Sequence, residues 1–357
     1  MDDWLIENLA CPRHQTQLSS RGDALMCPHG CEFPVVDGVP VMILGEADQT
    51  MDLVKTSLRQ ARQPSDDGGL YVESVGLNDD QKRGIVELAR TQRGGVDPVV
   101  SYIVAATNGI AYKSQVGKLA EYPIPTLRLP PSDGKVFLDI GCNWGRWCIA
   151  AARKGYKVVG IDPSLGAVMA AKRVARQLGI DARYVVGDAR FLPFKSSVID
   201  LVFSYSVLQH LSREHVALVV AESGRVLRSQ GAAFIQMPTK FGVRCLYHQL
   251  RRGFREARGF EVRYWTLPSL RKLFSSKIGP TTFSVDCFFG IGLQFADLRF
   301  MPIPLKLIVS LSELLRLTSR YMTPLTWTAD SVYVTSSKTA VAPPQDAPVA
   351  ELASQSR

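Results

Sequence analysis

Two glycines in the segment VFLDIGCNWGRW (136–147) have the spacing of a ligand-binding loop. Gly141 follows an apolar run directly, and Gly145 stands where a helix can begin. Glycine lets the backbone approach a ligand closely, and the N–H groups of a helix N-terminus are free to bind it. The dinucleotide fingerprint needs glycines at i, i+2 and i+5, but counted from Gly141 the last two places hold Asn143 and Arg146. The segment therefore predicts a nucleotide-type ligand that is not held by the dinucleotide pattern.

Acidic residues stand beside the apolar runs that surround this loop. Asp139 lies two residues before Gly141, Asp162 ends the run KVVGID, and Asp188 follows the run RYVVG. Ligands of open α/β sheets bind at the carboxyl ends of the strands, so Asp162 and Asp188 stand where contact with a bound ligand is expected. Solvated carboxylates at strand ends are the alternative explanation for Asp162 and Asp188.

Several motifs together resemble those of class I S-adenosylmethionine-dependent methyltransferases. DIGCNWG (139–145) resembles the first motif, DxGxGxG, with an asparagine at the middle glycine, where Asn tolerates positive φ better than most residues. GDARFLPF (187–194) resembles GDAxxLPF, and residues 199–211 resemble FDxVxS…VLxHL. RVLRSQGAAFIQMP (225–238) resembles the RVLKPGG turn into the fifth strand. The set, which covers residues 134–240 well, is similar to that of the small-molecule type 11 methyltransferases.

The resemblance implies contacts to S-adenosylmethionine after the first four strands of the domain. The carboxylate of Asp162 would accept the two ribose hydroxyls, and Asp188 with the backbone after it would recognise adenine. Asp139 would order the loop and also contact the cofactor. The expected cofactor-binding residues are Asp139, Gly141, Cys142, Asn143, Gly145, Asp162, Pro163, Asp188, Ala189 and Ser204.

The chemistry of methyl transfer asks little of a catalytic group. The sulfonium of the donor is already activated, so alignment of the acceptor with the methyl group supplies most of the effect. His210, in the segment VLQHL, is the weak candidate for a general base. The histidine at this place in the family is usually structural, which is the alternative. The sequence has neither an Asn-Pro-Pro-Tyr motif nor a cysteine in a C-methylation motif, so the acceptor atom stays open.

Cysteine and histidine residues near the N-terminus have the spacing of a metal site. CPRH (11–14) and CPHGC (27–31) give a C-x2-H…C-x3-C arrangement, and these ligand types suit a structural, tetrahedral Zn²⁺. The following FPVVDGVPVMI (33–43) resembles the YPIxDGIPxM strand of Trm112-like zinc ribbons, which usually have cysteine at the place of His14. The expected ligands are Cys11, His14, Cys27 and Cys31, with His29 as a competitor for the place of Cys31. A metal-free ribbon held by its apolar residues is the alternative.

The elements that must position these groups follow an alternating pattern. The apolar runs VFLDI, KVVGI, RYVVG, IDLVFS and AAFIQM recur at βαβ spacing, with helical stretches such as GRWCIAAARKG between them. Two later runs, FSVDCFF (283–289) and DSVYVTS (330–336), bring the strands to seven. We predict an α/β fold: a seven-stranded Rossmann-like methyltransferase sheet with helices on both faces, plus a small N-terminal zinc-ribbon-like β module.

The chain divides into four regions in this interpretation. Residues 1–45 form the ribbon module, and 46–130 form a helical lid or linker that ends in the proline-rich EYPIPTLRLPP and offers Tyr102, Tyr112 and Lys113 as lid contacts. Residues 131–337 form the methyltransferase domain, with an insertion or cap at 290–329. Residues 338–357 are small and polar with several prolines, which predicts a disordered tail.

Positive charge is concentrated in one segment. The formal net charge is +9, and residues 240–277 contain ten Lys and Arg against two acidic residues. This segment fits an anionic partner such as a nucleic acid or a membrane surface, or else a solvated helical face. Beside it, the insertion 290–322 contains a predicted helix that could dock on a membrane, although an ordinary buried helix explains the same pattern. The apolar residues that this helix places largely along one side are Leu307, Ile308, Leu311, Leu314, Leu315 and Leu317. The sequence has no run of eighteen apolar residues, and its acidic start and scattered cysteines favour a cytoplasmic protein, with peripheral contact at the inner membrane face through 240–322.

Three functions fit these features. The leading hypothesis is an S-adenosylmethionine-dependent methyltransferase that acts on a small molecule or on a lipid- or glycan-linked one. The second is a methyltransferase of ribosomal or transfer RNA, suggested by the ribbon and the basic segment, although aromatic RNA-recognition motifs are missing. The third is a non-catalytic adaptor that binds S-adenosylmethionine, which the intact set of acidic and glycine residues argues against.

Overall fold

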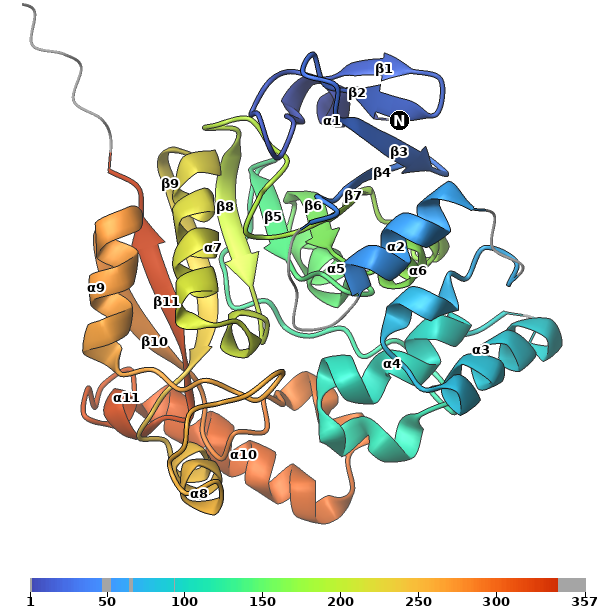
Figure 1. The fold of residues 1–357 in the computed structure, drawn as a ribbon. Coiled ribbons are helices and arrows are strands. Elements are labelled where there is room, and N and C mark those ends of the chain that lie inside the picture. Colours follow the sequence, from blue (N-terminus) through green and yellow to red (C-terminus); the bar gives the residue numbers. More distant parts are fainter. Residues whose placement is uncertain (1, 47–52, 64–66, 93, 340–357) are drawn as a thin grey trace, which may run out of the picture.

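The computed structural model describes residues 2–46, 53–63, 67–92 and 94–339 (Figure 1). One large sheet runs through the molecule, and its strands are, in spatial order, β1-β2-β3-β4-β7-β6-β5-β8-β9-β11-β10. The strands of the N-terminal part are β1 (Ser19–Arg21), β2 (Ala24–Met26), β3 (Glu32–Val36) and β4 (Val39–Met42). The others are β5 (Val136–Ile140), β6 (Lys157–Asp162), β7 (Ala182–Gly187), β8 (Ile199–Ser204), β9 (Leu227–Pro238), β10 (Thr281–Cys287) and β11 (Ser331–Ser337).

The sheet has eleven strands, so the prediction of seven is wrong. The strands predicted for the α/β domain are all present, but β4 pairs in parallel with β7 through Val41–Val186 and Met42–Gly187. The N-terminal module therefore extends the domain's sheet. Its first three strands continue outward from β4 in antiparallel pairs.

The central strands form a Rossmann-like core that is covered on both faces. Strands β7, β6, β5, β8 and β9 are parallel, and every residue of β5 is buried, as expected when helices cover both sides. One face packs against α5 (Arg146–Ala152) and α6 (Leu165–Gln177), the other against α7 (Arg213–Val226) and α9 (Leu267–Lys277). The chain order reverses between β5 and β8, which is where ligands of such sheets bind.

The region 46–130 adds a helical layer beside α5 and α6. It contains α2 (Leu53–Arg62), η1 (Val72–Val75), α3 (Asp79–Thr91), α4 (Pro98–Asn108) and η2 (Ile110–Gln115), while α1 (Asp3–Asn8) belongs to the N-terminal module. Tyr112, expected as a lid contact, is fully buried and donates its hydroxyl to Asp297 at 2.5 Å. The end of α4 reaches the carboxyl edge of the sheet, where Ala106 to Gly109 line a cavity.

The C-terminal part adds α8 (Val243–Arg251), η4 (Phe295–Phe300), α10 (Ile303–Thr318) and α11 (Leu325–Thr328). The interpretation of residues 303–317 as an ordinary buried helix is wrong: Leu307, Leu311 and Leu314 are 48–68% exposed. Over the described ranges, no helix combines the length and the apolar character needed to cross a membrane. Of the predicted tail, Lys338 still donates its backbone N–H to Gly231, and residues 340–357 lie outside the described part of the chain.

Candidate functional site

The loop between β5 and α5 has the backbone that the glycine pattern predicted. Gly141 and Gly145 have φ of +73° and +79°, and Asn143 also has positive φ, at +47°. A Cβ at position 141 would lie 2.3 Å from Cγ2 of Val207, so glycine is required there for space as well as for conformation. Asn143 fits because Asn adopts this region more readily than most residues.

Asp162, at the end of β6, holds the glycine loop in place. Its Oδ2 accepts the backbone N–H of Asn143 at 3.0 Å, and its Oδ1 accepts that of Ser164 at 2.9 Å. Burial raises the pKa of Asp162 to about 6 despite these two hydrogen bonds. Burial likewise raises the pKa of Asp139 to about 7, and its Oδ2 accepts from the thiol of Cys148. Asp139 and Asp162 are therefore both buried, and Asp162 is hydrogen-bonded directly to the loop.

Asp188 follows β7 and has a strong partner that the sequence analysis missed. Its Oδ2 lies 2.6 Å from Nη2 of Arg190, and both residues are buried. Two other predicted cofactor-binding residues also have partners within the protein. The hydroxyl of Ser204 donates to the carbonyl of Ile140, and the carbonyl of Pro163 accepts from the hydroxyl of Ser57. The i, i+2 spacing of an acid and an arginine after a strand was the signal that could have revealed this ion pair.

A cavity of about 250 Å³ opens at the carboxyl ends of β8 and β9. It is lined from the sheet, from the end of α4, from α8 and from the loop after β10. The groups that matter chemically are Arg146, Tyr205, Gln209, Gln236, His248, Tyr264, Asp286 and Asp330. Arg146, the residue after Gly145, joins this cavity to the glycine loop, while none of the predicted cofactor-binding residues lines it.

Arg146, the first residue of α5, presents a buried cation to this cavity. It is 7% exposed, and its guanidinium lies 5.2 Å from the ring centre of Trp147 and 5.8 Å from that of Tyr205. In the described part of the chain, no carboxylate oxygen lies within 4.0 Å of it. A buried cation without a counter-ion is costly, so Arg146 is suited to an anionic group of a ligand. The sequence analysis used Arg146 only to count glycines.

Acidic groups lie at the opposite wall of the cavity. Asp286 is fully partnered, since it accepts from Arg128, Tyr205 and Ser331 at 2.7–3.1 Å. Asp330 accepts the backbone N–H of Cys245 with Oδ1, but its buried Oδ2 has no partner among the described residues. An unpaired buried carboxylate oxygen favours a hydrogen-bond donor on a bound molecule.

His210 is held by its neighbours and is not among the residues that line the cavity. Its ring stacks on Phe260 with 3.8 Å between ring centres, and Nδ1 lies 2.7 Å from the carbonyl of Phe260. Nε2 lies 3.0 Å from the amide nitrogen of Gln209. Burial lowers the pKa of His210, which favours the neutral ring. These contacts support the structural alternative over a general base.

The four predicted metal ligands come together in the N-terminal module. Nδ1 of His14 lies 3.6, 3.4 and 3.5 Å from the sulfur atoms of Cys11, Cys27 and Cys31, and all four ligand atoms lie within 4.8 Å of one another. Tetrahedral Zn²⁺ with Zn–S and Zn–N bonds of about 2.3 and 2.1 Å places sulfur and nitrogen about 3.6 Å apart. The ring of His29 lies tilted against that of His14, with 4.7 Å between the ring centres, and is not part of this group. The donor set therefore fits zinc.

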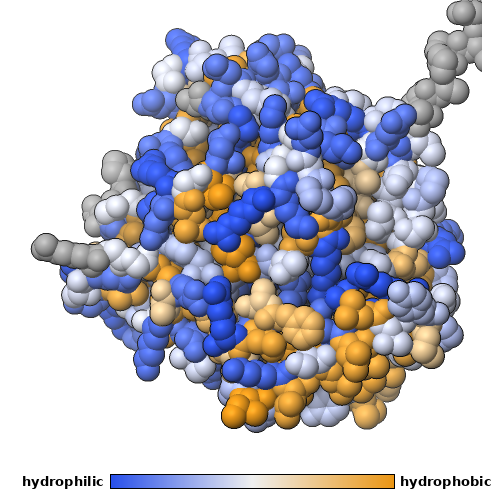
Figure 2. All heavy atoms as spheres, turned by 180° about the vertical axis from the view of Figure 1, so that it is seen from behind, coloured by the Kyte–Doolittle hydropathy of each residue, from blue (hydrophilic) through white to orange (hydrophobic). Residues whose placement is uncertain are grey.

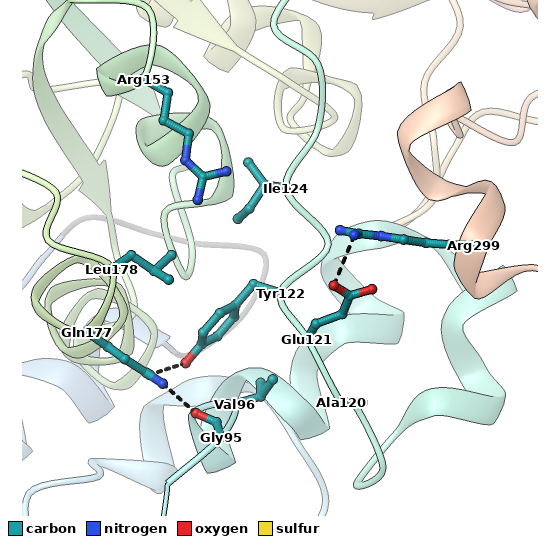
Figure 3. A pocket seen from close by; sticks show the side chains of 10 residues that line it. All are labelled: Gly95, Val96, Ala120, Glu121, Tyr122, Ile124, Arg153, Gln177, Leu178 and Arg299. Carbon is teal, nitrogen blue, oxygen red and sulfur yellow. Dashed lines mark hydrogen bonds and ion pairs between the residues drawn. The ribbon is translucent and has the colours of Figure 1, made fainter.

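A second hollow, of about 480 Å³, lies between α6 and the chain that follows η2 (Figure 3). Tyr122 donates to Gln177 across it, Arg299 pairs with Glu121, and Arg153 points into it (Figure 3). This hollow shares no lining residue with the first cavity, so the two are separate.

The fold and the loop define a Rossmann-like domain with a glycine-rich loop after the strand β5. Residues 137–231 match a family model described as a methyltransferase domain. This chain therefore contains a methyltransferase domain, as the motifs predicted.

Curated relatives are similar to this chain over about a third of its length. Ubiquinone biosynthesis O-methyltransferase of Bartonella quintana is 35% identical over 109 residues, which are 30% of this chain and 42% of the relative. The protein of the same name from Brucella anthropi is 32% identical over 105 residues, 29% of this chain and 42% of the relative. The chain thus spans less than half the length of these relatives.

Solved structures show weaker similarity over more of the chain. The YcgJ protein of Bacillus subtilis has a TM-score of 0.41 and 18% identity, over 59% of this chain and 94% of that one. Magnesium protoporphyrin IX methyltransferase of Synechocystis PCC 6803 has a TM-score of 0.42 and 14% identity, over 81% of this chain and 97% of that one. Similarity at this level supports no conclusion about substrate.

Proposed function

We propose that this protein is an S-adenosylmethionine-dependent methyltransferase that acts on a small molecule or on a lipid- or glycan-linked one. The observation that best supports this proposal lies at the carboxyl edge of the sheet. There the loop whose glycines Gly141 and Gly145 have no room for a side chain is followed directly by Arg146, an unpaired cation that lines a cavity. The methyltransferase match over residues 137–231 supports the same assignment. The relatives named for ubiquinone biosynthesis support a small acceptor that carries a hydroxyl group.

The cofactor would lie along the ends of β5, β6, β7 and β8. In this proposal the backbone from Gly141 to Gly145 lets it approach, and Asp162 accepts the ribose hydroxyls. The pair of Asp188 and Arg190 with Ala189 borders the adenine, and Arg146 binds the methionine carboxylate. The sulfonium supplies an activated methyl group, and the walls of the cavity align the acceptor with it. Oδ2 of Asp330 accepts a hydrogen bond from the acceptor's hydroxyl group.

Arg146→Gln should weaken the binding of S-adenosylmethionine by about 10- to 100-fold, the range expected when a charged hydrogen bond is lost. Isothermal titration calorimetry with S-adenosylmethionine and with 5′-methylthioadenosine shows whether the lost contact is the one to the methionine carboxylate. 5′-Methylthioadenosine lacks the methionine carboxylate, so its affinity should be the same for the variant and the unaltered protein.

Arg153→Gln is the matched control, because this arginine ends the same helix but points into the other hollow (Figure 3). It should leave both affinities unchanged. Equal loss for the two ligands, or no loss for either, would contradict the role of Arg146. Failure of the unaltered, folded protein to bind S-adenosylmethionine would overturn the proposed function itself.

The affinity for S-adenosylmethionine should rise with pH through about 6 and level off above it. Ribose hydroxyls donate to the ionised carboxylate of Asp162, whose pKa is raised by burial to about 6. Below that pH the affinity should fall, by at most about tenfold per pH unit. Folding stability should depend on pH in the opposite direction. The pKa of Asp162 is higher in the folded than in the unfolded state, so its contribution to the free energy of unfolding decreases as the pH rises from about 4 to 6.

Calorimetry at a series of pH values checks this prediction. Asp162→Asn should remove most of the pH dependence. Asp139→Asn is the control, because Asp139 is the neighbouring acid whose pKa is also raised, to about 7. If Asp139→Asn removed the pH dependence of the affinity and Asp162→Asn kept it, the titrating group would be Asp139, and the role given to Asp162 would be refuted.

We further propose that residues 1–45 are a Trm112-like module that binds structural Zn²⁺ through Cys11, His14, Cys27 and Cys31. The division into this module, a helical region at 46–130, a methyltransferase domain at 131–337 and a cap at 290–329 is supported by the separate helical layer and by the C-terminal helices. Peripheral contact with a membrane through 240–322, on the cytoplasmic side, is part of the same proposal.

A further inference from the structure

Helix α8 has the reverse of the polarity expected for a helix on a protein surface. Its exposed side chains include an apolar stripe, with members three or four residues apart that are 39–65% exposed: Val243, Leu246, Tyr247 and Leu250. His248 and Arg251 are also exposed. Gln249, by contrast, is buried and donates to the carbonyls of Lys240 and Cys245. Surface helices normally place the apolar stripe inward and the polar side chains in water. The exposed apolar stripe of α8 therefore indicates an interaction surface.

Helix α10 is reversed in the same way. Its outward side chains form an apolar stripe and are 48–74% exposed: Ile303, Leu307, Leu311 and Leu314. Two polar residues face the protein: Glu313 pairs with Arg128 and Arg316, and the hydroxyl of Ser312 accepts the backbone N–H of Phe288. The inward bonds fix the orientation of the helix, so its leucines cannot turn inward without breaking a buried ion pair.

Both helices lie at the same end of the molecule. α8, α10 and α11 form the lower end in Figure 1, and apolar side chains gather along the lower edge in Figure 2. Tyr321, Met322 and Trp327 are also exposed there, from α11 and the loop before it. Apolar surface of this extent marks an interaction site.

The exposed charged side chains of α8 and α10 have one sign. Lys240, Arg251, Lys306 and Arg320 are exposed, and within the described part of the chain no acidic side chain lies within 4.0 Å of them. Between Ile303 and Thr328 the sequence contains one acidic residue, the buried Glu313. Aromatic and aliphatic side chains flanked by basic residues are the composition that binds in the interface of anionic lipid bilayers.

We propose that the outer faces of α8 and α10 dock on an anionic lipid bilayer, and that the methyl acceptor is a lipid-borne molecule that enters the cavity from that bilayer. The second half rests on the proposed function. Arg244, Cys245 and His248 line the cavity from the inner face of α8, opposite its apolar stripe. Helix α8 therefore separates the cavity from the docking surface. An amphipathic acceptor that lies in the bilayer needs to pass only the edge of this helix to reach the cavity.

Flotation of the full chain with vesicles tests the docking. The protein should float with vesicles of phosphatidylcholine and phosphatidylglycerol, much less with phosphatidylcholine alone, and less as salt is added. The triple variant Leu307→Gln, Leu311→Gln and Leu314→Gln should bind the mixed vesicles at least about tenfold more weakly. Leu218→Gln is the matched control, because Leu218 is a leucine of α7 with 45% exposure outside this surface, and it should bind as the unaltered protein does.

The outcomes separate docking from activity. No flotation with the mixed vesicles, equal binding by the triple variant, or a dimer that the triple variant dissociates would overturn the docking. Loss of S-adenosylmethionine binding with flotation intact would remove the proposed function and leave the docking in place. Labelled methyl from S-adenosylmethionine should enter membrane lipid extract incorporated in the mixed vesicles, and less so with the triple variant. Label found only in RNA would overturn the lipid-borne acceptor.

Discussion

Gly141→Ala should reduce the affinity for S-adenosylmethionine by about 100-fold. The new Cβ would lie 2.3 Å from Cγ2 and 3.0 Å from Cγ1 of Val207, at a residue whose φ is +73°. Left-handed backbone costs a non-glycine residue about 1–2 kcal/mol, and overpacking adds about 1–3 kcal/mol. The loop must move to relieve the clash, and the backbone that approaches the cofactor moves with it. Calorimetry measures the loss.

Two further variants separate the clash from the backbone strain. Gly179→Ala is the control, because Gly179 has a φ of +64° with nothing within 4 Å of the added Cβ. It should lose a little stability and no affinity. The double variant Gly141→Ala, Val207→Ala should regain much of the affinity, since the two nearest atoms are removed. If Gly141→Ala binds normally, the loop is not the cofactor site.

Removal of the metal should unfold the N-terminal module. With Cys27→Ser or a strong chelator, we expect the amide protons of residues 2–46 to exchange rapidly and the melting temperature to fall by about 10 °C or more. Structural zinc contributes folding free energy directly, and β1 and β2 are only three residues each, too short to be stable alone. Elemental analysis of the unaltered protein should find about one zinc per chain.

His29→Ala is the control for the zinc prediction. Its ring lies 4.7 Å from that of His14, yet it is outside the group of four ligands. The variant should keep both its zinc and its melting temperature. A native, well-folded preparation without metal would refute the zinc site and favour a ribbon held by its apolar residues.

Much of the methyltransferase core was predictable from the sequence because its signals are local. Apolar runs gave the seven strands of the α/β domain, and glycine spacing gave the loop after β5. The positive φ of Asn143 follows from the side chain's own preference. Cys and His spacing likewise predicted a cluster whose four ligand atoms lie within 4.8 Å.

The rest depended on tertiary contacts that no local pattern specifies. The pairing of β4 with β7 joins residues far apart in the chain, so the sheet came out four strands larger than predicted. The apolar stripe of α10 is visible in the sequence, but which face turns outward is decided by Arg128, which binds Glu313 from a distant segment. The lack of a carboxylate beside Arg146 depends on which residues of other segments surround it, and the sequence does not specify those neighbours.

The pairing of β4 with β7 also bears on how the protein behaves in a crowded solution. Without β4, the apolar strand β7 would end the sheet and offer its unpaired backbone groups to any other chain. The added strands move the edge outward to β1, whose three residues, Ser19 to Arg21, are all exposed and polar. A short, polar, charged strand is a poor template for further pairing. By covering the edge of β7, the N-terminal module thus reduces the tendency of the sheet to pair with other chains and aggregate.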